Sequence, residues 1–241
     1  MMGNVILSAR MQAVADLVSK GNRVCDVGCD HGYVSIYLVQ QGIAPGVLAM
    51  DINEGPLKRA QEHVEQAGLS EYITLRISDG LSAYRPGEAG TLICAGMGGR
   101  LMQRIMEQEP EKTKTFQELI LQPQSEISAF RKFLRNVGYS IKWEDMILEE
   151  DKFYPIIKAV PGKECEEQAD YELSDRYGPV LLANRHPVLI KYLKKEWKSS
   201  IQLREMLKAA GSSQRARQRL EELDGELHFL REALKICGCE P

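Results

Sequence analysis

Residues 22–33 read NRVCDVGCDHGY, and this stretch decides the fold. An apolar run from Arg23 to Val27 leads into a turn at Gly28, where the missing Cβ lets the backbone approach a ligand. A helix can then start near His31. In the next apolar run, VLAMD, Asp51 stands where a carboxylate can accept both hydroxyls of a ribose. The spacing predicts a βαβ unit that binds a nucleotide-type cofactor.

Asp30 replaces the second glycine of a dinucleotide-binding G-x-G-x-x-G loop, and this departure indicates the kind of cofactor. Glycines in that loop let a pyrophosphate reach a helix N-terminus. Asp26 and Asp30 would repel a pyrophosphate. They suit a ligand that carries an ammonium and a sulfonium, S-adenosylmethionine. A strand–turn–helix without a ligand is the alternative, and an NAD-dependent dehydrogenase is disfavoured.

Apolar runs alternate with amphipathic segments through the first half of the chain and predict an α/β fold, with a parallel sheet covered by helices on both faces. The expected strands are Val24–Val27, Gly46–Met50, Ile73–Ile77, Thr91–Ala95 and Leu119–Leu121. The expected helices are 6–19, Val34–Gln41, Gly55–Gln66, Gly99–Gln108 and Glu126–Asn136.

The pattern changes after Gly138 to two strand-like runs, Ser140–Leu148 and Tyr154–Val160, joined by the acidic turn EEDK. They predict an antiparallel hairpin that closes an otherwise parallel sheet. Nucleotide-binding dehydrogenases usually end with another crossover instead. This ending favours the class I methyltransferase architecture, with its Rossmann-like sheet.

The polar segment PGKECEEQAD, residues 161–170, predicts a boundary between domains 1–163 and 164–241. Two long helical patterns follow, the first over Ile190–Leu207, and GSS at 211–213 can turn the chain back. We expect an antiparallel helical hairpin, although the second pattern could instead support a coiled-coil dimer, which leaves a monomer or a weak dimer open. Its heptad seam comprises Ala216, Leu220, Leu223, Leu227, Leu230, Leu234 and Cys237.

Charge is unevenly distributed along the chain, whose net charge is −3. Residues 1–169 contain 18 Lys and Arg against 23 Asp and Glu, a net charge of −5, whereas residues 170–241 contain 13 against 11, a net charge of +2. Clustered cations of the second segment suit a phosphate backbone, although such clusters are more often a solvated helix face. The candidate RNA-binding residues are Lys191, Lys194, Lys195, Lys198, Arg215, Arg217 and Arg219.

Other features narrow the cellular setting. No stretch approaches the ~18 apolar residues of a membrane span, and the N-terminal residues lack the pattern of a secretion signal. Cys25 and Cys94 lie inside apolar runs, as reduced and buried cysteines do. Scattered histidines and the lack of a C-x-x-C pair argue against zinc. We expect a cytoplasmic protein that binds neither a membrane nor a metal.

Three further strand ends supply candidate site residues, because ligands of open α/β sheets lie at the carboxyl ends of the strands. Asp79, in the triplet SDG, can accept the exocyclic amine of an adenine ring, or it serves as an N-cap or turn residue. AGMGG at 95–99 has three glycines, so its backbone must reach a ligand or pass a steric bottleneck. Gln122 before Pro123 ends the fifth strand, in a loop or in the site.

Several segments together resemble the bacterial TrmK family of tRNA (adenine-22, N1)-methyltransferases. They are LSARMQAVADLV, DVGCDHGY, AGMGG, LILQPQ and the C-terminal helical pattern. The similarity covers essentially the whole chain. It implies a class I domain that uses S-adenosylmethionine to methylate N1 of adenine-22 in tRNA, joined to a helical, coiled-coil-like domain that helps to hold the tRNA.

The resemblance also implies residue roles. Asp26 to His31 would lie along the methionine end of the cofactor, Asp51 would bind ribose, Asp79 the adenine ring, and Gly96–Gly99 would lie between cofactor and target base. The implied cofactor-binding residues are Asp26, Gly28, Asp30, His31, Asp51, Ile52, Asn53, Ser78, Asp79, Gly80, Ala95, Gly96, Met97, Gly98 and Gln122. The implied catalytic residues are Asp30, His31 and Met97.

Methyl transfer to adenine N1 requires in-line attack by an in-plane lone pair, and it needs no general base because the product is itself a cation. Positioning would supply much of the acceleration, and the base must leave its stack. AGMGG lacks the side chains of the Asn/Asp-Pro-Pro-Tyr/Phe loop of amino methyltransferases. We therefore hypothesise that carbonyls near Gly96 and Met97 orient the adenine while Asp30 or His31 contacts its edge. Alternatives are a methyltransferase of another RNA or of a small molecule, and an inert interaction module.

Overall fold

The computed structural model describes residues 4–162, 171–209 and 213–240 of the chain. The chain forms two compact units, Met1–Glu166 and Glu167–Pro241, which are described separately below. The predicted boundary between residues 163 and 164 lies outside the described residues.

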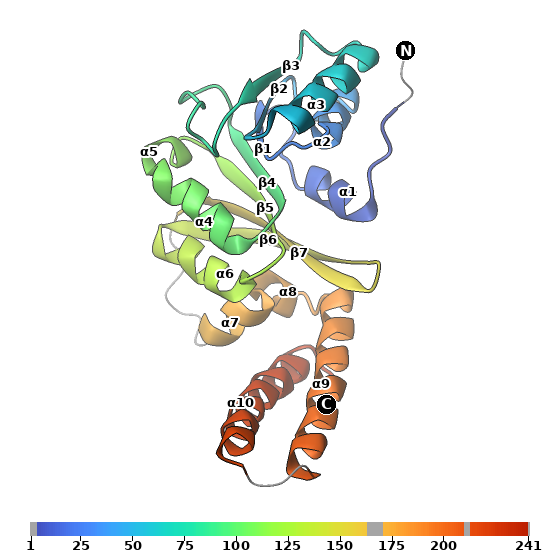
Figure 1. Ribbon diagram of the computed structural model, residues 1–241, viewed down its shortest axis with the longest axis vertical. Coiled ribbons are helices and arrows are strands. Elements are labelled where there is room, and N and C mark those ends of the chain that lie inside the picture. Colours follow the sequence, from blue (N-terminus) through green and yellow to red (C-terminus); the bar gives the residue numbers. More distant parts are fainter. Residues whose placement is uncertain (1–3, 163–170, 210–212, 241) are drawn as a thin grey trace. The chain divides into compact units, whose positions relative to one another are not determined.

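A seven-stranded sheet forms the centre of the first unit (Figure 1). Its strands are β1 (Val24–Val27), β2 (Val47–Asp51), β3 (Ile73–Ile77), β4 (Thr91–Met97), β5 (Glu118–Pro123), β6 (Tyr139–Glu149) and β7 (Lys152–Pro161). The order is β3-β2-β1-β4-β5-β7-β6, with parallel pairing from β3 to β5. β7 is antiparallel to both β5 and β6. The predicted parallel sheet with a closing hairpin is therefore confirmed.

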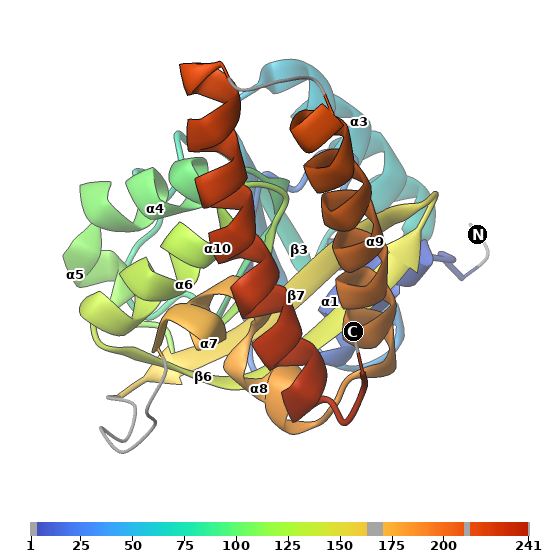
Figure 2. The same cartoon turned by 90° about the horizontal axis from the view of Figure 1, so that it is seen from below.

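Helices cover both faces of this sheet (Figure 2). They are α1 (Ala9–Asp16), α2 (Tyr33–Gln40), α3 (Glu54–Ala67), α4 (Gly99–Gln108), α5 (Pro110–Thr113) and α6 (Ile127–Asn136). Side chains alternate along the strands, so that Cys25 and Val27 pack in the core under α4 and α6, while Val24 packs in the core under α1, α2 and α3. This alternation explains why the central strands β1, β2, β4 and β5 are largely apolar.

Most elements differ from their predicted bounds by one to three residues, and two of these differences bear on the site. The first helix was expected over residues 6–19 but spans Ala9–Asp16, because Ser8 caps it by accepting a hydrogen bond from the Met11 amide at 3.4 Å. β4 was expected to end at Ala95 but continues to Met97, with an irregularity in its pairing to β5. The AGMGG segment is thus partly strand.

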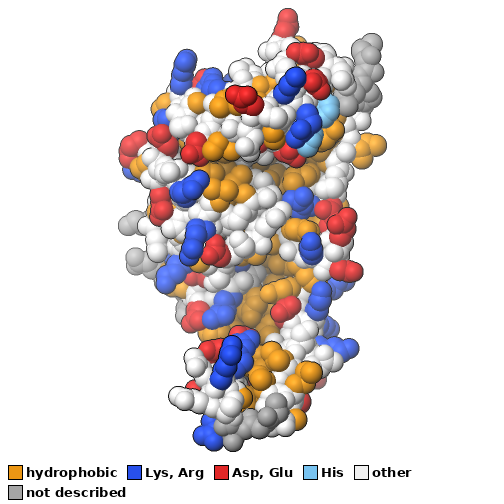
Figure 3. Space-filling model, in the orientation of Figure 1, with side chains coloured by type: hydrophobic (Ala, Val, Ile, Leu, Met, Phe, Trp, Pro, Cys, Tyr) orange, Lys and Arg blue, Asp and Glu red, His pale blue; other side chains and the backbone are white. Residues whose placement is uncertain are grey.

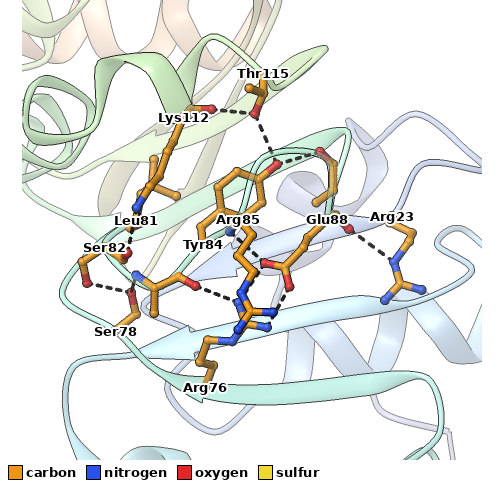
Figure 4. A network of polar contacts seen from close by, with 12 residues as sticks. Arg23, Arg76, Ser78, Leu81, Ser82, Tyr84, Arg85, Glu88, Lys112 and Thr115 are labelled. Carbon is orange, nitrogen blue, oxygen red and sulfur yellow. Dashed lines mark hydrogen bonds and ion pairs between the residues drawn. The ribbon is translucent and has the colours of Figure 1, made fainter.

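The connection from β3 to β4 contains no helix in this described part of the chain, and a polar network holds it in place (Figure 4). Arg76 donates to both carboxylate oxygens of Glu88, each at 2.8 Å, and to the Ala83 carbonyl at 2.7 Å. Hydrogen bonds from Arg76 hold the pKa of Glu88 at about 2. Lys112 donates to the carbonyls of Leu81 and Ser82. These bonds hold the turn that follows β3 at the carboxyl edge of the sheet.

The described residues of the second unit form four helices: α7 (Tyr171–Tyr177), α8 (Pro179–Ala183), α9 (Pro187–Ala209) and α10 (Gln214–Ile236). Arg204 of α9 pairs with Asp224 of α10 at 2.8 Å, and Arg231 of α10 lies over the Trp197 ring of α9. The further along α9 a residue lies, the earlier in α10 its partner lies, so the two helices are antiparallel. The predicted antiparallel hairpin is confirmed. Most of the heptad seam is buried within this unit, and Ala216 with Leu220 is half-buried.

Within the described residues, no helix has the length and apolar character needed to cross a membrane. No group of three or more His, Cys, Asp or Glu in these ranges is placed to hold a metal ion. Burial raises the pKa of the Cys25 and Cys94 thiols, so both are held in the neutral form.

Candidate functional site

A cleft of about 360 Å³ lies where the β1–α2 turn meets the end of β4. β1 is flanked by β2 on one side and by β4 on the other, so this is the topological switch point at which open α/β sheets bind ligands. The volume falls in the range of small-molecule sites. The lining residues are Arg10, Met11, Asp26, Gly28, Cys29, Asp30, His31, Tyr33, Val34, Ile93, Ala95, Gly96 and Gln124.

The β1–α2 turn presents its backbone to this cleft. Gly28 has a φ of +75° and Asp30 a φ of +49°, and the amides of Gly28 and Cys29 both donate to the Met50 carbonyl of β2, at 2.8 and 3.1 Å. A Cβ on Gly28 would lie 2.9 Å from the Met97 Cε atom. The Met97 Cε atom is the end of a flexible side chain and can move, so the positive φ is what favours glycine at this position.

Asp26 and Asp51 stand at the ends of the neighbouring strands β1 and β2. Asp26 is buried and accepts a hydrogen bond from Ser35 Oγ at 2.7 Å, and burial raises its pKa to about 6. Asp51 accepts from the amide of Asn53 at 2.9 Å through Oδ1 and from that of Asp30 at 3.3 Å through Oδ2. Each Asp51 oxygen has a second lone pair, so the carboxylate can also accept the hydroxyls of a ribose.

The His31 ring is held by two charged neighbours. Its Nδ1 lies 2.8 Å from Asp30 Oδ2, and its Nε2 accepts a hydrogen bond from Arg59 Nε at 2.9 Å. An adenine edge would have to displace Arg59 in order to reach Nε2. The Asp30 side chain remains two-thirds exposed, so of Asp30 and His31, two of the three predicted catalytic residues, Asp30 is the more accessible.

The glycine pair at 98–99 serves packing against the β5–α6 loop. A Cβ on Gly98 would lie 2.9 Å from Ser125 Oγ, and a Cβ on Gly99 would lie 2.7 Å from the Ser125 carbonyl oxygen. The Gly99 amide also donates to that carbonyl at 3.0 Å. The sequence left open whether the AGMGG backbone reaches a ligand or passes a steric bottleneck, and the steric bottleneck holds for Gly98 and Gly99. Of this segment, only Ala95 and Gly96 line the cleft.

Gln122 acts behind the cleft and does not line it. Its side chain is fully buried, its Oε1 accepts from the Gly96 amide at 3.1 Å and from Arg10 at 2.9 Å, and its Nε2 donates to the Pro123 carbonyl at 3.3 Å. Both of its polar atoms are used within the protein. Gln122 therefore positions Gly96 and Arg10, and its predicted contact with the cofactor stays a prediction.

Arg10, in the first turn of α1, is a site residue that sequence reasoning missed. Its guanidinium lies over the Tyr154 ring at 5.0 Å, and its Nε lies 3.6 Å from Glu149 Oε2, within ion-pair range but beyond hydrogen-bond distance. About one-fifth of the side chain is exposed. A single arginine on the apolar face of a short amphipathic helix was the available signal.

The predicted adenine-side residues follow β2 and β3 and lie outside the cleft lining. Ser78 is a turn residue, because its Oγ donates to the Gly80 carbonyl at 2.8 Å and accepts from the Ala83 amide at 3.1 Å. The Asp79 side chain is about half exposed and lies 4.0 Å from Arg104. The predicted cofactor residues absent from the lining are Asp51, Ile52, Asn53, Ser78, Asp79, Gly80, Met97, Gly98 and Gln122.

The predicted RNA-binding residues lie on α9 and α10 of the second unit. Four exposed lysines of α9 are spaced three and four residues apart, on the face opposite the buried Leu189 and Leu193. On α10, Arg219 pairs with Glu222 at 3.2 Å and Glu226 at 2.8 Å, so its charge is already matched. The exposed predicted residues are Lys191, Lys194, Lys195, Lys198, Arg215 and Arg217.

The sheet order, the closing hairpin and the switch-point cleft define a Rossmann-like methyltransferase. In agreement, residues 7–157 match the family described as Methyltransferase domain. The chain is also 32% identical to the tRNA (adenine(22)-N(1))-methyltransferase of Bacillus subtilis (strain 168), over 97% of this chain and 99% of that protein. The chain therefore belongs to the family of tRNA (adenine(22)-N(1))-methyltransferases, as the sequence motifs predicted.

Solved structures agree with this assignment. Streptococcus pneumoniae Sp1610 in complex with S-adenosyl-L-methionine is 32% identical, with a TM-score of 0.82 over 95% of this chain and 100% of that chain. M. capricolum TrmK in complex with the cofactor product S-adenosyl-homocysteine is 25% identical, with a TM-score of 0.82 over 96% of this chain and 99% of that chain. These likenesses extend over both units of the protein.

Proposed function

We propose that this protein transfers a methyl group from S-adenosylmethionine to N1 of adenine-22 in tRNA. The observation that carries the proposal is the switch-point cleft with Asp26 and Asp51 at the ends of neighbouring strands, in a chain of this family. Carboxylates at these positions match a cofactor with a ribose and a cationic amino-acid end.

Residues of the cleft, together with Asp51 at the adjoining end of β2, match the chemical groups of S-adenosylmethionine. Asp51 would accept the ribose hydroxyls, and the carboxylates of Asp26 and Asp30 would face the ammonium of the methionine part. That part also carries a carboxylate, and Arg10 is the lining residue with a permanent positive charge. We assign Arg10 to this carboxylate, which explains why Gln122 and Glu149 hold its guanidinium at the cleft.

When bound, S-adenosylmethionine supplies an electrophilic methyl group on a sulfonium. The bond from adenine N1 to the methyl carbon forms as the carbon–sulfur bond breaks, so the positive charge passes from sulfur to the adenine ring. No proton leaves, and the chain therefore needs no general base. Its residues contribute by orienting the two reactants, an effect of about 7–11 kcal/mol in well-oriented systems.

The exposed lysines of α9 would supply contacts to the tRNA backbone that do not depend on sequence. The first unit would then receive the adenine, which must leave its stack to reach the cleft.

Labelled S-adenosylmethionine, purified protein and an unmodified tRNA transcript test the proposal, with nucleoside mass spectrometry as the readout. We expect 1-methyladenosine, and none with a transcript in which adenine-22 is replaced by guanine. A product confined to another RNA would transfer the activity to that RNA. Absence of calorimetric heat with S-adenosylhomocysteine would favour the inert interaction module.

A further inference from the structure

Three aromatic rings gather beside the cleft, from the β1–α2 turn and from α3. The Tyr33 and His63 centroids are 4.8 Å apart, and that of His31 lies 6.1 Å from each. If the three rings were stacked in one column, the distance between the two outer centroids would be about the sum of the other two centroid distances. Because all three separations are similar, the rings form an offset triangle.

All three rings face nearly the same way, because their interplanar angles are only 10°, 21° and 25°. Tyr33 is 42% exposed, and the side chain of His31 is 34% exposed. Figure 3 shows histidine surface beside Lys and Arg side chains over α3. The arrangement is therefore a partly open aromatic surface, which we call the ring platform (His31, Tyr33 and His63).

Hydrogen bonds hold the two histidine rings of the ring platform before any ligand arrives. His63 Nδ1 lies 3.0 Å from the His31 carbonyl oxygen, and His31 Nδ1 lies 2.8 Å from Asp30. Arg59 and His63 are four residues apart on α3 and so project from the same face of that helix. Rings held in this way lose little conformational entropy when a flat ligand stacks on them.

Arg59 adds an exposed positive charge to one edge of the ring platform. Its Nε donates to His31 Nε2, and among the residues described no carboxylate lies within ion-pair distance of its guanidinium. A phosphate could therefore bind this guanidinium without competing with a protein carboxylate. Aromatic rings with an arginine alongside are typical of sites for single-stranded nucleic acid.

We propose that the ring platform stacks an unpaired nucleobase of the substrate RNA at the mouth of the cleft, and that Arg59 binds the adjoining phosphate. This inference rests on the proposed function, because it takes RNA to be the substrate. His31 and Tyr33 both line the cleft, so a base on these rings lies beside the place where methyl transfer is proposed.

Steady-state kinetics with unmodified tRNA test the stacking. We expect Tyr33→Leu and His63→Ala to raise KM for tRNA roughly 5- to 100-fold, the range for loss of one base–aromatic stack. Tyr33→Phe keeps the ring and should stay within about 3-fold of wild type on the same scale. Tyr72→Leu, at a similarly exposed tyrosine before β3, is the matched control and should change nothing.

Calorimetry with S-adenosylhomocysteine separates stacking from a folding defect. His63 does not line the cleft, so His63→Ala should keep the wild-type Kd for this ligand while its KM for tRNA rises. An unchanged KM for tRNA in both Tyr33→Leu and His63→Ala would overturn the inference. Failure of the wild-type protein to methylate tRNA would instead refute the proposed function.

Fluorescent RNA identifies which base is stacked. In tRNA carrying 2-aminopurine at position 22, or at either neighbouring position, stacking on the rings should quench fluorescence with wild-type protein but not with Tyr33→Leu. Quenching at position 22 would place the target base on the platform, and quenching at a neighbour would place a flanking base there. No quenching at any of the three positions would overturn the inference.

Salt dependence tests the phosphate contact. Arg59→Met should lower the slope of log K against log salt concentration by about 1, whereas Tyr33→Leu should leave that slope unchanged. An unaltered slope in Arg59→Met would remove the phosphate from the proposal.

Discussion

Replacing Arg10 by methionine tests how the cofactor's amino-acid end is recognised. Methionine keeps much of the apolar stem but removes the charge and all the donors of the guanidinium. At 4 Å and an effective dielectric constant of 20, two unit charges attract by about 4 kcal/mol. Glu149, 3.6 Å from Arg10 Nε, and the one-fifth exposure of the side chain reduce this attraction.

The expected loss is therefore that of one charge-assisted hydrogen bond, about 2 kcal/mol, or roughly a 30-fold rise in Kd for S-adenosylhomocysteine. The substitution also leaves Gln122 Oε1 with one donor fewer and Glu149 without its cation. That structural penalty is the same whichever ligand binds. A second ligand is needed to separate the two effects.

Calorimetry with the decarboxylated analogue, which keeps the ammonium but has no carboxylate, supplies this comparison. Wild-type protein and Arg10→Met should bind the analogue with Kd values within about 3-fold of one another, because the contact under test is absent. Arg10→Lys, which keeps the charge but loses the planar fork, should fall between them with S-adenosylhomocysteine. Equal weakening of both ligands in Arg10→Met would refute the assignment and leave Arg10 as a packing residue of α1.

Three further predictions concern charge. Because burial raises the pKa of Asp26 to about 6, its carboxyl is neutral below that pH, so the calorimetric Kd for S-adenosylhomocysteine should rise about tenfold per pH unit below 6, and Asp26→Asn should abolish this slope. Arg131→Met removes the partner of a fully buried carboxylate 2.8 Å away and should lower the unfolding free energy by about 3–5 kcal/mol in urea titrations; a loss under about 1 kcal/mol would contradict this account. The double variant Lys191→Glu, Lys198→Glu should raise KM for tRNA at an unchanged Kd for S-adenosylhomocysteine, whereas Arg219→Gln, whose charge two glutamates already match, should cost less; the reverse order would argue against α9 as the RNA face.

Strands were the most predictable elements, because their side chains alternate between two apolar cores and leave continuous apolar runs. β1, which is buried along its whole length, agrees with its predicted bounds for this reason. The edge strand β3 also agrees, although only Ile73 in it is buried. The short helices α7 and α8 were not predicted, since seven and five residues hold too few turns to show a helical period. The start of α1 depended on one hydrogen bond to Ser8 and not on periodicity.

Site residues were predictable where they follow a strand in the chain, and they were missed where they arrive from elsewhere. Asp26, Gly28 and Gly96 line the cleft because the parallel strands that carry them end together at its edge. Arg10 and Gln124 reach the same cleft from α1 and from the β5–α6 loop. The only local signal for Arg10 was its place on the apolar face of a short helix, and Gln124 had none.

The close contact between the glycine pair at 98–99 and Ser125 packs the end of β4 and the start of α4 tightly against the β5–α6 loop. A methyl group added at Gly99 would push the Ser125 carbonyl outward, and Gln124, the next residue in that loop, lines the cleft. The position of Gln124 at the cleft therefore depends on two glycines that do not themselves line it.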